Sequence, residues 1–255
     1  MRKNSFEWIK LDNAGKIFPG QNMRRWSNVF RLGVQLKEEI DPELLKEALK
    51  ITLLRIPSLK VRMKKGFFWN YFENNEMECP VNPDIKNHCY RIHFKENNGY
   101  LFRVYYHNKC IGVDIYHSLC DGHAGAVFIS TLVGQYLRLK GYAVSHNQFV
   151  LDAEEDVKSE ELEDAYRRHS SSKVKYDVKE TRVYHKRGTK LPIHMCNYTV
   201  CTMPIEKLRD LSKSYGVTIT ELFAAVLLDI HYRKQLAEGK TNKEVSEIGL
   251  GTWQL

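Results

Sequence analysis

A change of hydrophobic pattern near residue 116 places the strongest constraint on the fold of this chain. Residues 90–116 form β-rich runs, separated by turn-forming residues at Asn97–Gly99 and His107–Lys109. Residues 122–141 then have the spacing of a helix. The side chains available to face a core are Val127, Phe128, Val133, Tyr136 and Leu137. The chain therefore passes from a sheet into a helix within the stretch IYHSLCDGHAG.

The N-terminal part of the chain supplies a further strand and helix. Residues Phe30–Leu36 alternate as a half-buried strand does. Asp41 followed by Pro42 is a typical helix N-cap with proline at the first helical position, and Pro57 ends the pattern. The apolar face of this helix consists of Leu45, Ala48, Leu49, Thr52, Leu53 and Ile56.

A hairpin is predicted next. Residues 59–63 alternate, residues 64–66 (KKG) offer a turn, and residues 67–72 (FFWNYF) supply an aromatic strand. Aromatic side chains in such a strand belong to a core more often than to a ligand site, so we expect them to be buried.

A charged segment divides the chain. Residues 152–164 carry eight acidic side chains and one lysine, and residues 167–190 carry nine Lys or Arg against two acids. Such blocks are typical of an exposed helix or connector. We therefore expect a first lobe at 1–150, a connector at 151–190 and the beginning of a second lobe at 191–255.

The second lobe is expected to contain a strand at 197–203, a short helix closed by Gly216, and a longer helix. Thr218 and Glu221 have the spacing of a capping box, and the apolar density of Leu222–Ile230 predicts a helix buried on most sides. Covering such a helix requires more sheet than the rest of the chain offers, so the second lobe is predicted to be incomplete.

Composition narrows the class of protein. With 255 residues, 43% hydrophobic and 27% charged, the chain is expected to be globular, as one large domain or two ordinary ones. It has no apolar run of about 18 residues and no signal peptide, so we expect no membrane span and a cytoplasmic location. Six cysteines without a CxxC pair indicate reduced thiols. The net charge of +8 accompanies no nucleic-acid-binding module, so no nucleic-acid partner is expected.

The junction itself holds several candidate functional residues. His117 falls on the strand face that also carries Ile111, Val113 and Ile115, which is compatible with a core histidine or with a functional one. Asp121 is a natural N-cap for the following helix. The small residues that follow, Gly122, Ala124, Gly125 and Ala126, leave the start of that helix uncluttered for another backbone or a ligand.

Two other chemistries are less compatible with the same stretch. A metal site would use His117, Asp121 and His123, but no fourth ligand stands at a recognised spacing, so no metal is predicted. Cys120 lacks the sequence surroundings of a catalytic thiol and is expected to pack as a small hydrophobic side chain, with His123 at the surface.

The segment His117–Gly122 is an HxxxDG motif, and it resembles the active-site motif of the chloramphenicol-acetyltransferase-like superfamily of CoA-dependent acyltransferases. The resemblance extends over residues 6–238. It includes the start WIKLDNAGKIFP, similar to the alcohol acetyltransferase branch, the helix ending in LLRIPSL, and the segment GVTITELFAAVLLDIHY that resembles the opening of a second lobe. The fold class implied is α/β (α+β): a mixed β-sheet flanked by helices, as an acyltransferase-like first lobe plus the start of a second.

This resemblance implies a function. His117 would be the general base that takes the proton from an alcohol or amine acceptor as it attacks an acyl-CoA thioester, because an ordinary imidazole is mostly neutral near pH 7. Asp121, with Gly122, would support the site, typically through an arginine from the second lobe. Acetyl-CoA or another acyl-CoA would be a co-substrate, with no tightly bound cofactor. The CoA-binding residues and the donor to the oxyanion are not identified.

Two departures from the superfamily qualify these expectations. Tyr116 stands where condensation domains carry a second histidine, which favours simple acyl transfer over peptide synthesis. The chain also lacks the later asparagine-leucine-arginine and DFGWG motifs, which predicts a truncated second lobe. The alternatives are a non-catalytic half-enzyme that acts as an interaction module, and self-association that completes a site between subunits. Self-association ranks lower, because His117 precedes 138 residues whereas the trimeric enzymes carry the motif near the chain's end.

Overall fold

The computed structural model describes residues 8–12, 15–21, 27–84, 90–162, 184, 188–189, 191–192, 197 and 199–240. The chain divides into two compact units, Met1–Ser171 with Pro192–Cys196 and Ser172–Leu191 with Asn197–Leu255. The predicted lobe boundaries at residues 150 and 190 remain a prediction. Most of the predicted connector, 163–183, lies outside the described residues.

The centre of the first unit is a four-stranded sheet in the order β2-β7-β6-β5. Its strands are β2 (Val29–Gln35), β7 (Cys110–Tyr116), β6 (Phe102–His107) and β5 (Val81–Pro83). The pairs β2–β7 and β6–β7 are antiparallel, whereas β5 pairs with β6 in parallel. The sheet is therefore mixed, as the predicted fold class requires.

The turns predicted around this sheet are present, but residues 90–96, which were predicted as a β-rich run, form no strand. Asn98 and Gly99 have positive φ angles of 51° and 85°, and Asn108 in the β6–β7 turn has a φ of 48°. Asparagine and glycine tolerate this left-handed conformation better than other residues, so these positions favour tight turns.

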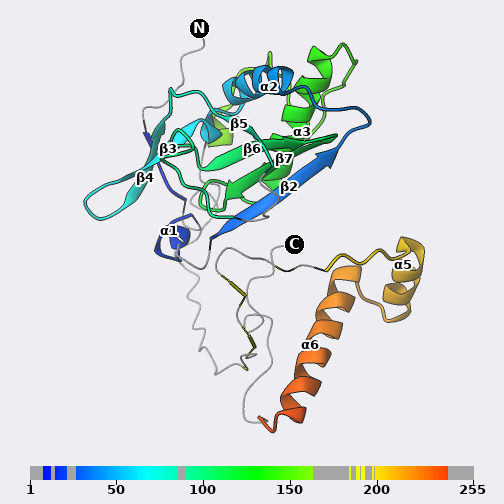
Figure 1. Ribbon diagram of the computed structural model, residues 1–255. Helices are drawn as coiled ribbons and strands as arrows, with labels where there is room; N and C mark the ends of the chain where they lie inside the picture. The colour runs from blue at the N-terminus through cyan, green and yellow to red at the C-terminus, as the bar shows by residue number, and fades with distance from the viewer. Residues whose placement is uncertain are drawn as a thin grey trace. The chain divides into compact units, whose positions relative to one another are not determined.

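Two helices pack against one face of the sheet (Figure 1). They are α2 (Pro42–Arg55) and α3 (Gly122–Leu139). Asp41 caps α2 by accepting hydrogen bonds from Glu43 N at 2.9 Å and Leu44 N at 3.2 Å, as predicted. Their apolar faces join the strand residues Ile111, Val113 and Ile115 in one buried cluster. The helix-flanked sheet predicted from the sequence is thus confirmed.

A smaller antiparallel sheet has the order β1-β4-β3 and consists of β1 (Trp8–Lys10), β4 (Asn70–Asn74) and β3 (Val61–Lys65). Ile9, Phe72 and Met63 are cross-strand neighbours on one face and belong to a second apolar cluster. The described part of the first unit also contains three short elements: α1 (Ile17–Gln21) and the 3₁₀ turns η1 (Pro57–Leu59) and η2 (Ser159–Leu162).

The predicted hairpin is confirmed, but the prediction that its aromatic side chains are buried is wrong for the first three. Phe67, Phe68 and Trp69 are 92%, 85% and 56% exposed, and only Phe72 of the group lies in the core. The hydrogen bond from Gly66 N to Trp69 O, 2.7 Å long, closes the turn around Phe67 and Phe68. These residues stand at the hairpin's tip because the turn comes later than the KKG signal suggested.

The acidic run after residue 151 is anchored to the first unit at the end of α2. Arg55 is only 1% exposed and donates to Glu161 at 2.5 and 3.0 Å and to the Asp152 carbonyl at 3.0 Å. The hydrogen bond with Glu161 raises the pKa of Arg55 against the opposing effect of its burial. Residues 152–162 are therefore a docked segment in the described part of the run, rather than only a solvated connector.

The second unit contains α5 (Ile205–Ser214) and α6 (Ile219–Ala237). The predicted capping box at the start of α6 is confirmed, because Thr218 N donates to Glu221 Oε2 at 2.7 Å and Glu221 N donates to Thr218 Oγ1 at 3.2 Å. Gly216, with a φ of 68°, follows α5 as expected. Residues 199–203 form no strand, and Asn197 lies outside regular structure as well. A strand requires a pairing partner, and the described residues of this unit supply none.

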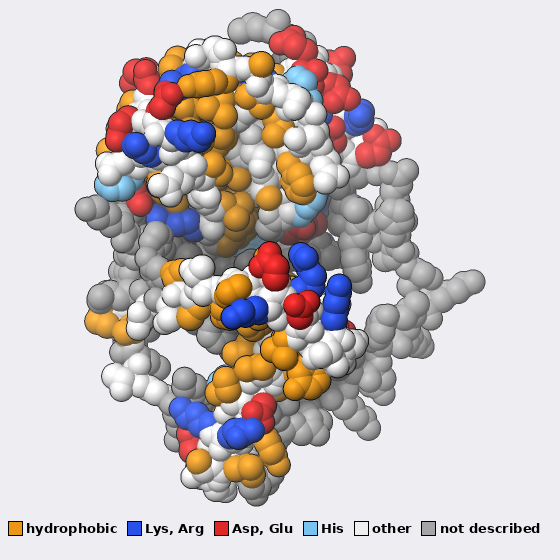
Figure 2. All heavy atoms as spheres, turned by 90° about the vertical axis from the view of Figure 1, so that its right-hand side faces the viewer, with side chains coloured by type: hydrophobic (Ala, Val, Ile, Leu, Met, Phe, Trp, Pro, Cys, Tyr) orange, Lys and Arg blue, Asp and Glu red, His pale blue; other side chains and the backbone are white. Residues whose placement is uncertain are grey.

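The apolar helix α6 is more exposed than its sequence predicts. Gln235 is its one buried side chain among those described, whereas Phe223, Val226, Ile230 and Tyr232 are 39–54% exposed (Figure 2). The prediction of a helix buried on most sides is therefore wrong. In the described part of the chain, no single helix is long and apolar enough to cross a membrane. The pair α5 and α6 meets that test by length and composition, with a 78° bend between them.

Candidate active site at the start of helix α3

The HxxxDG segment forms a tight connection between β7 and α3. Leu119 N donates to Tyr116 O at 2.8 Å, and His117 N donates to the Asn28 carbonyl at 2.7 Å, which ties the turn to the residues before β2. Asp121 accepts from Ala124 N at 2.8 Å and is the N-cap of α3. The predicted capping role of Asp121 is confirmed.

The imidazole of His117 lies between two aromatic rings. It stacks on Phe18 of α1, with ring centroids 4.7 Å apart and an interplanar angle of 18°, and it meets Phe30 of β2 at 5.1 Å and 61°. The side chain is half-buried, and neither ring nitrogen hydrogen-bonds a described residue. Its orientation is therefore set by ring packing, which leaves both nitrogens uncommitted within the described structure.

This geometry changes the balance between the two readings of His117. A structural histidine in a core is normally fully buried and hydrogen-bonded, because an unpaired buried polar group is costly. His117 is next to the core, since Phe30 belongs to the main apolar cluster, yet it is neither fully buried nor paired with a described residue. The described structure is compatible with a packing role and with a functional role for His117, and it leaves the ring nitrogens without a described partner.

The start of α3 beside His117 is open in the first unit. Asp121, Gly122, His123 and Ala124 are exposed, and a Cβ built on Gly122 would meet no atom within 4 Å. Gly125 has a packing role instead. A Cβ added at this position would lie 3.1 Å from side chains of the sheet, so glycine allows α3 to pack closely against it. The open space at this helix start is therefore next to Gly122.

The support expected from Asp121 is only partly seen. Its carboxylate bonds to the helix backbone, and in the described part of the chain it makes no ion pair with an arginine. The arginine that the family resemblance implies, typically from the second lobe, stays a prediction. In the described part of the first unit, Asp121 fixes the turn that carries His117 through the N-cap hydrogen bond.

Cys120 packs against the main core cluster. Burial, together with the nearby carboxylates of Asp121 and Asp12, raises the pKa of the Cys120 thiol to about 12. The thiolate is the reactive form of cysteine, so this environment disfavours a nucleophilic role, in agreement with the packing role expected from sequence. Among the described residues, no group of three or more His, Cys, Asp or Glu side chains could hold a metal ion.

Sequence reasoning missed the contribution of the segment around α1. Ser118 is buried and donates from Oγ to the Gly15 carbonyl at 2.7 Å. Gly15 in turn donates to the Asp12 carboxylate. These bonds fasten α1, and with it Phe18, to the turn that holds His117. The stretch WIKLDNAGKIFP had been singled out in the sequence for its family resemblance. Its role in the site could not be predicted, because the Ser118–Gly15 contact joins residues that are 103 positions apart.

A charged row on the opposite face of the sheet was also missed. Asp114 is fully buried on β7 and is the direct cross-strand neighbour of Arg31 on β2 and of Arg103 on β6. Arg31 donates to its two oxygens at 2.6 and 3.0 Å, and Arg103 Nε donates at 2.7 Å. The dipeptide Phe-Arg occurs in both strands, at Phe30–Arg31 and Phe102–Arg103, and could have suggested a charged residue on one face of each. Only the strand register shows that both arginines contact the same aspartate.

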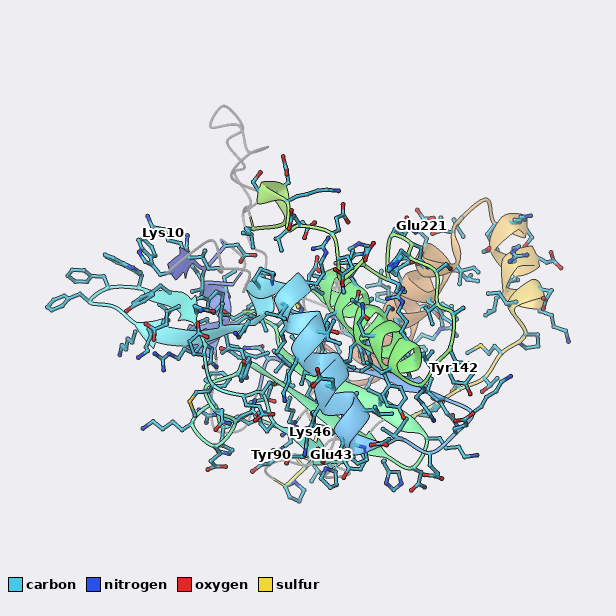
Figure 3. The ribbon with its side chains drawn as sticks, turned by 90° about the horizontal axis from the view of Figure 1, so that it is seen from above. Lys10, Glu43, Lys46, Tyr90, Tyr142 and Glu221 are labelled. Atoms are coloured by element: carbon cyan, nitrogen blue, oxygen red, sulfur yellow. The ribbon has the colours of Figure 1, made fainter. Side chains whose placement is uncertain are left out.

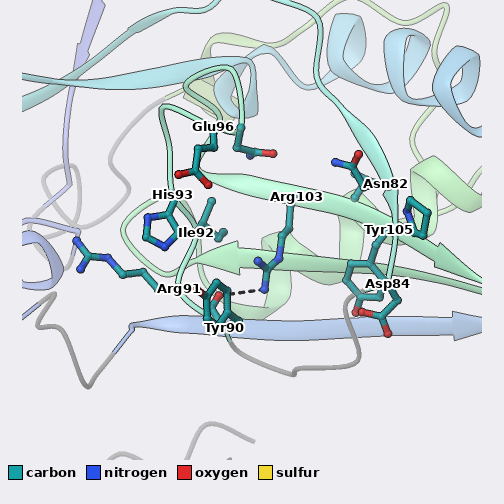
Figure 4. Close-up of a pocket in the computed structure, with 12 residues that line it drawn as sticks. Asn82, Asp84, Tyr90, Arg91, Ile92, His93, Glu96, Arg103 and Tyr105 are labelled. Carbon is teal, nitrogen blue, oxygen red and sulfur yellow. Dashed lines mark hydrogen bonds between the residues drawn. The ribbon is translucent and has the colours of Figure 1, made fainter. Parts of the chain in front are cut away.

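Arg103 of this row lines a hollow of about 400 Å³, together with Asp84, Tyr90 and Tyr105 (Figure 4). Arg31 also reaches Asp84 at 3.2 Å and lies 4.0 Å over the Tyr105 ring, while Arg103 donates to the Tyr90 carbonyl at 3.0 Å. Burial alone would lower the pKa of Arg31, but its hydrogen bond with Asp114 and that residue's charge raise it instead. The Arg31 side chain is thus held as a cation on this face.

Comparison with known proteins gives structural likeness only. No family model matches the chain, and no curated protein matches its sequence. Solved structures with a similar arrangement include the starter condensation domain of rhizomide synthetase RzmA, in a mutant form in complex with C8-CoA, with 12% identity and a TM-score of 0.43. Polyketide synthase associated protein 5 from Mycobacterium tuberculosis has 18% identity and a TM-score of 0.39, and SgcC5 from Streptomyces globisporus has 14% and 0.42.

These likenesses extend over parts of both chains. They cover 52%, 52% and 55% of this protein, respectively. The chain in turn spans 36%, 33% and 38% of the length of those three structures.

Proposed function

We propose that this chain belongs to a CoA-dependent acyltransferase in which His117 is the general base. The observation that carries the proposal is the position of the imidazole. It is held between Phe18 and Phe30 at the end of β7, with uncommitted ring nitrogens, beside the open start of α3. The HxxxDG sequence places this arrangement where the acyltransferase superfamily carries its base.

The proposed reaction requires one proton acceptor and no covalent enzyme intermediate. A nitrogen of His117 takes the proton from the acceptor hydroxyl or amine as its oxygen or nitrogen attacks the carbonyl carbon of the acyl-CoA thioester. The tetrahedral intermediate then breaks the carbon–sulfur bond, and the imidazolium returns the proton to the leaving CoA sulfur. The products are an ester or amide and free CoA. A positioned base contributes about 10² to 10⁴ in rate.

The surrounding residues have positioning roles in this proposal. Stacking on Phe18 restricts rotation of the imidazole, and the cap made by Asp121 holds the turn between strand and helix. Gly122 leaves room for the thioester to approach. Acetyl-CoA or another acyl-CoA is the proposed co-substrate and a small alcohol or amine the acceptor, with no tightly bound cofactor.

The test is an acyl-transfer assay on the full chain. Release of the CoA thiol from acetyl-CoA and from longer acyl-CoA is measured with a panel of alcohols and amines. We expect His117→Ala to lower kcat by about 10² or more, as for loss of a general base. His123→Ala is the matched control, because this exposed histidine lies on the same turn and should tolerate the change. Equal activity of the wild type and His117→Ala would exclude His117 as the base.

A second candidate function is a non-catalytic interaction module. The observation favouring it is the exposed apolar surface of α6 in the second unit, which a complete enzyme lobe would be expected to cover. Absence of turnover and of acyl-CoA binding by the wild type, with an intact fold, would favour this candidate. Binding of acyl-CoA that depends on the α3 start would favour the enzyme.

A further inference from the structure

Among the described residues of the first unit, the β3–β4 hairpin carries the most exposed aromatic side chains. Phe67 and Phe68 are 92% and 85% exposed, and their rings contact each other edge to face with centroids 5.1 Å apart. Trp69 follows at 56%. Figure 1 shows the hairpin projecting beyond the sheet and helices of its unit. A soluble surface rarely concentrates three large apolar side chains at one projecting point without an interaction to cover them.

The residues next to this tip are basic. Lys64 and Lys65 end β3 immediately before the turn, and Lys10 of β1 is the cross-strand neighbour of Tyr71 (Figure 3). Lys10 and Lys65 are exposed and make no ion pair with a described residue. The apolar tip is therefore bordered by uncompensated positive charge.

The outer face of the small sheet has the same character. Cross-strand pairing places Trp8, Glu73 and Arg62 in one row and Lys10, Tyr71 and Lys64 in the next. Trp8 is exposed and meets the Tyr71 ring edge to face at 6.3 Å. The face thus combines aromatic rings and cations, which is the composition of a surface that lies at a membrane interface.

We propose that the β3–β4 hairpin is a membrane-docking tip that inserts into the interface of a bilayer containing anionic lipids. Phe67 and Phe68 enter the boundary between headgroups and acyl chains, and Trp69 lies at headgroup depth. Lys10 and Lys65 face the anionic headgroups. This docking involves a hairpin tip and no membrane-spanning element.

A nucleic acid is the competing partner for a basic aromatic surface, and the geometry favours it less. Glu73 stands in the middle of the outer face, bonded to Arg62 and 3.3 Å from Lys64, so a phosphate backbone along this face would meet a carboxylate. The two phenylalanines stand at the projecting turn that the Gly66–Trp69 hydrogen bond closes, whereas proteins that bind single-stranded nucleic acid present a groove that follows the backbone. A convex apolar point is suited to insertion between lipids.

The experiment measures partitioning of the full chain onto vesicles by sedimentation. Vesicles of phosphatidylcholine alone are compared with vesicles containing about 30% phosphatidylserine, where an anionic surface attracts adjacent cations. We expect binding to the anionic vesicles and at least a tenfold lower partition coefficient for the double variant Phe67→Ser, Phe68→Ser. Both side chains are almost fully exposed, so the thermal unfolding of this variant should match that of the wild type.

The matched control separates the tip from the other exposed apolar surface. Val226→Ser with Ile230→Ser makes an equally polar change on α6 and should leave vesicle binding within twofold of the wild type. Loss of binding in this variant but not in the tip variant would overturn the proposal, as would failure of the wild type to bind anionic vesicles. Equal binding to neutral vesicles would overturn the role of the lysines.

Depth is tested by fluorescence in a variant whose only tryptophan is Trp69. Its emission should shift to the blue on anionic vesicles and be quenched by lipids brominated on the acyl chain. Unchanged emission on vesicles that bind the protein would overturn insertion of the tip. Vesicle-independent binding of an oligonucleotide that the Phe67→Ser, Phe68→Ser variant loses would assign the surface to nucleic acid instead. Acyl-transfer activity with soluble substrates is expected to be equal in the tip variant and the wild type, so this test is independent of the proposed function.

Discussion

The two faces of strand β7 show opposite uses of neighbouring residues. Ile111, Val113 and Ile115 point into a dry core with α2 and α3, and the strand then delivers His117 to the edge of that core. The alternate face buries Asp114 between Arg31 and Arg103. One strand thus supplies an uncommitted titratable group at its end and a fully paired one within its length. The comparison shows that hydrogen-bond and ion-pair partners distinguish the two residues. Asp114 has two arginine partners and a structural role, whereas His117 has no described partner and is the catalytic candidate.

The largest expected effect comes from removing the buried carboxylate. Asp114→Ala removes the carboxylate that Arg31 and Arg103 share and leaves Asp84 as the acidic neighbour of Arg31, so we expect the free energy of unfolding to fall by about 3–5 kcal/mol. Urea unfolding followed by circular dichroism measures this change. Replacing all three charged residues with apolar ones of similar size should recover most of the loss. A loss below about 1 kcal/mol for Asp114→Ala would contradict the view that the row is structural.

The opposite result is expected for the histidine at the end of the strand. His117→Ala should lower kcat by about 10², with a loss of stability of only about 1 kcal/mol, because the side chain is half-buried and pairs with no described residue. Parallel measurement of turnover and urea unfolding compares the two faces directly. A large stability loss with unchanged turnover would make His117 a packing residue and erase the contrast.

Substitution of a glycine should cost more stability on the charged face of β7, at Gly112, than on the core side, where Gly125 of α3 packs against the sheet. A Cβ on Gly112 would lie 2.2 Å from the Tyr105 ring on the charged face, and overpacking of this kind costs about 1–3 kcal/mol. A Cβ on Gly125 would meet sheet side chains at 3.1 Å, a smaller overlap that the better helix propensity of alanine, about 1 kcal/mol, partly offsets. Thermal unfolding of Gly112→Ala and Gly125→Ala should rank them in that order. The reverse order would indicate that the Tyr105 ring yields more easily than the helix packing.

The smallest effect is a pH dependence from Cys120. Its pKa rises from 9.0 to about 12 on folding, mainly through burial, so the unfolded state loses the thiol proton first as pH rises. Stability from this residue is complete below pH 9 and falls through the interval between the two values, by about 1 kcal/mol between pH 8 and pH 10. Cys120→Ala should lose less stability over that interval in urea unfolding. An identical pH profile would show that the thiol is not buried in the native state.

Local patterns were sufficient for much of the fold. The Asp41-Pro42 start of α2, the Asp121 cap of α3 and the capping box of α6 depend on residues within one helical turn, so each could be predicted. The strands β2 and β7 followed from alternation. The tip of the hairpin was misplaced because an aromatic run has strand character in either a strand or a turn, and only the Gly66–Trp69 hydrogen bond decides which.

The candidate site was predictable in its own segment and not beyond it. His117, Asp121 and Gly122 were identified from one short stretch, and their roles in acyl transfer remain a prediction. The rings that hold the imidazole, Phe18 and Phe30, lie far from it in sequence, and their contact depends on how α1 and β2 meet β7. The exposure of α6 was missed for a related reason. The apolar residues of a helix show how much surface it could bury, but they do not show whether another element covers that surface.

By itself, the sequence determined the longer helices α2, α3, α5 and α6, the caps of α2, α3 and α6, and that a strand ends at a histidine before a capped turn. Only the tertiary structure decided that Asp114 meets Arg31 and Arg103, that His117 is stacked and unpaired, and that three aromatic rings stand in solvent. The physical reason is the sequence separation of the residues that interact. Caps and periodicity arise from interactions within a few residues, whereas burial and charge pairing are set by strand register and packing between distant segments.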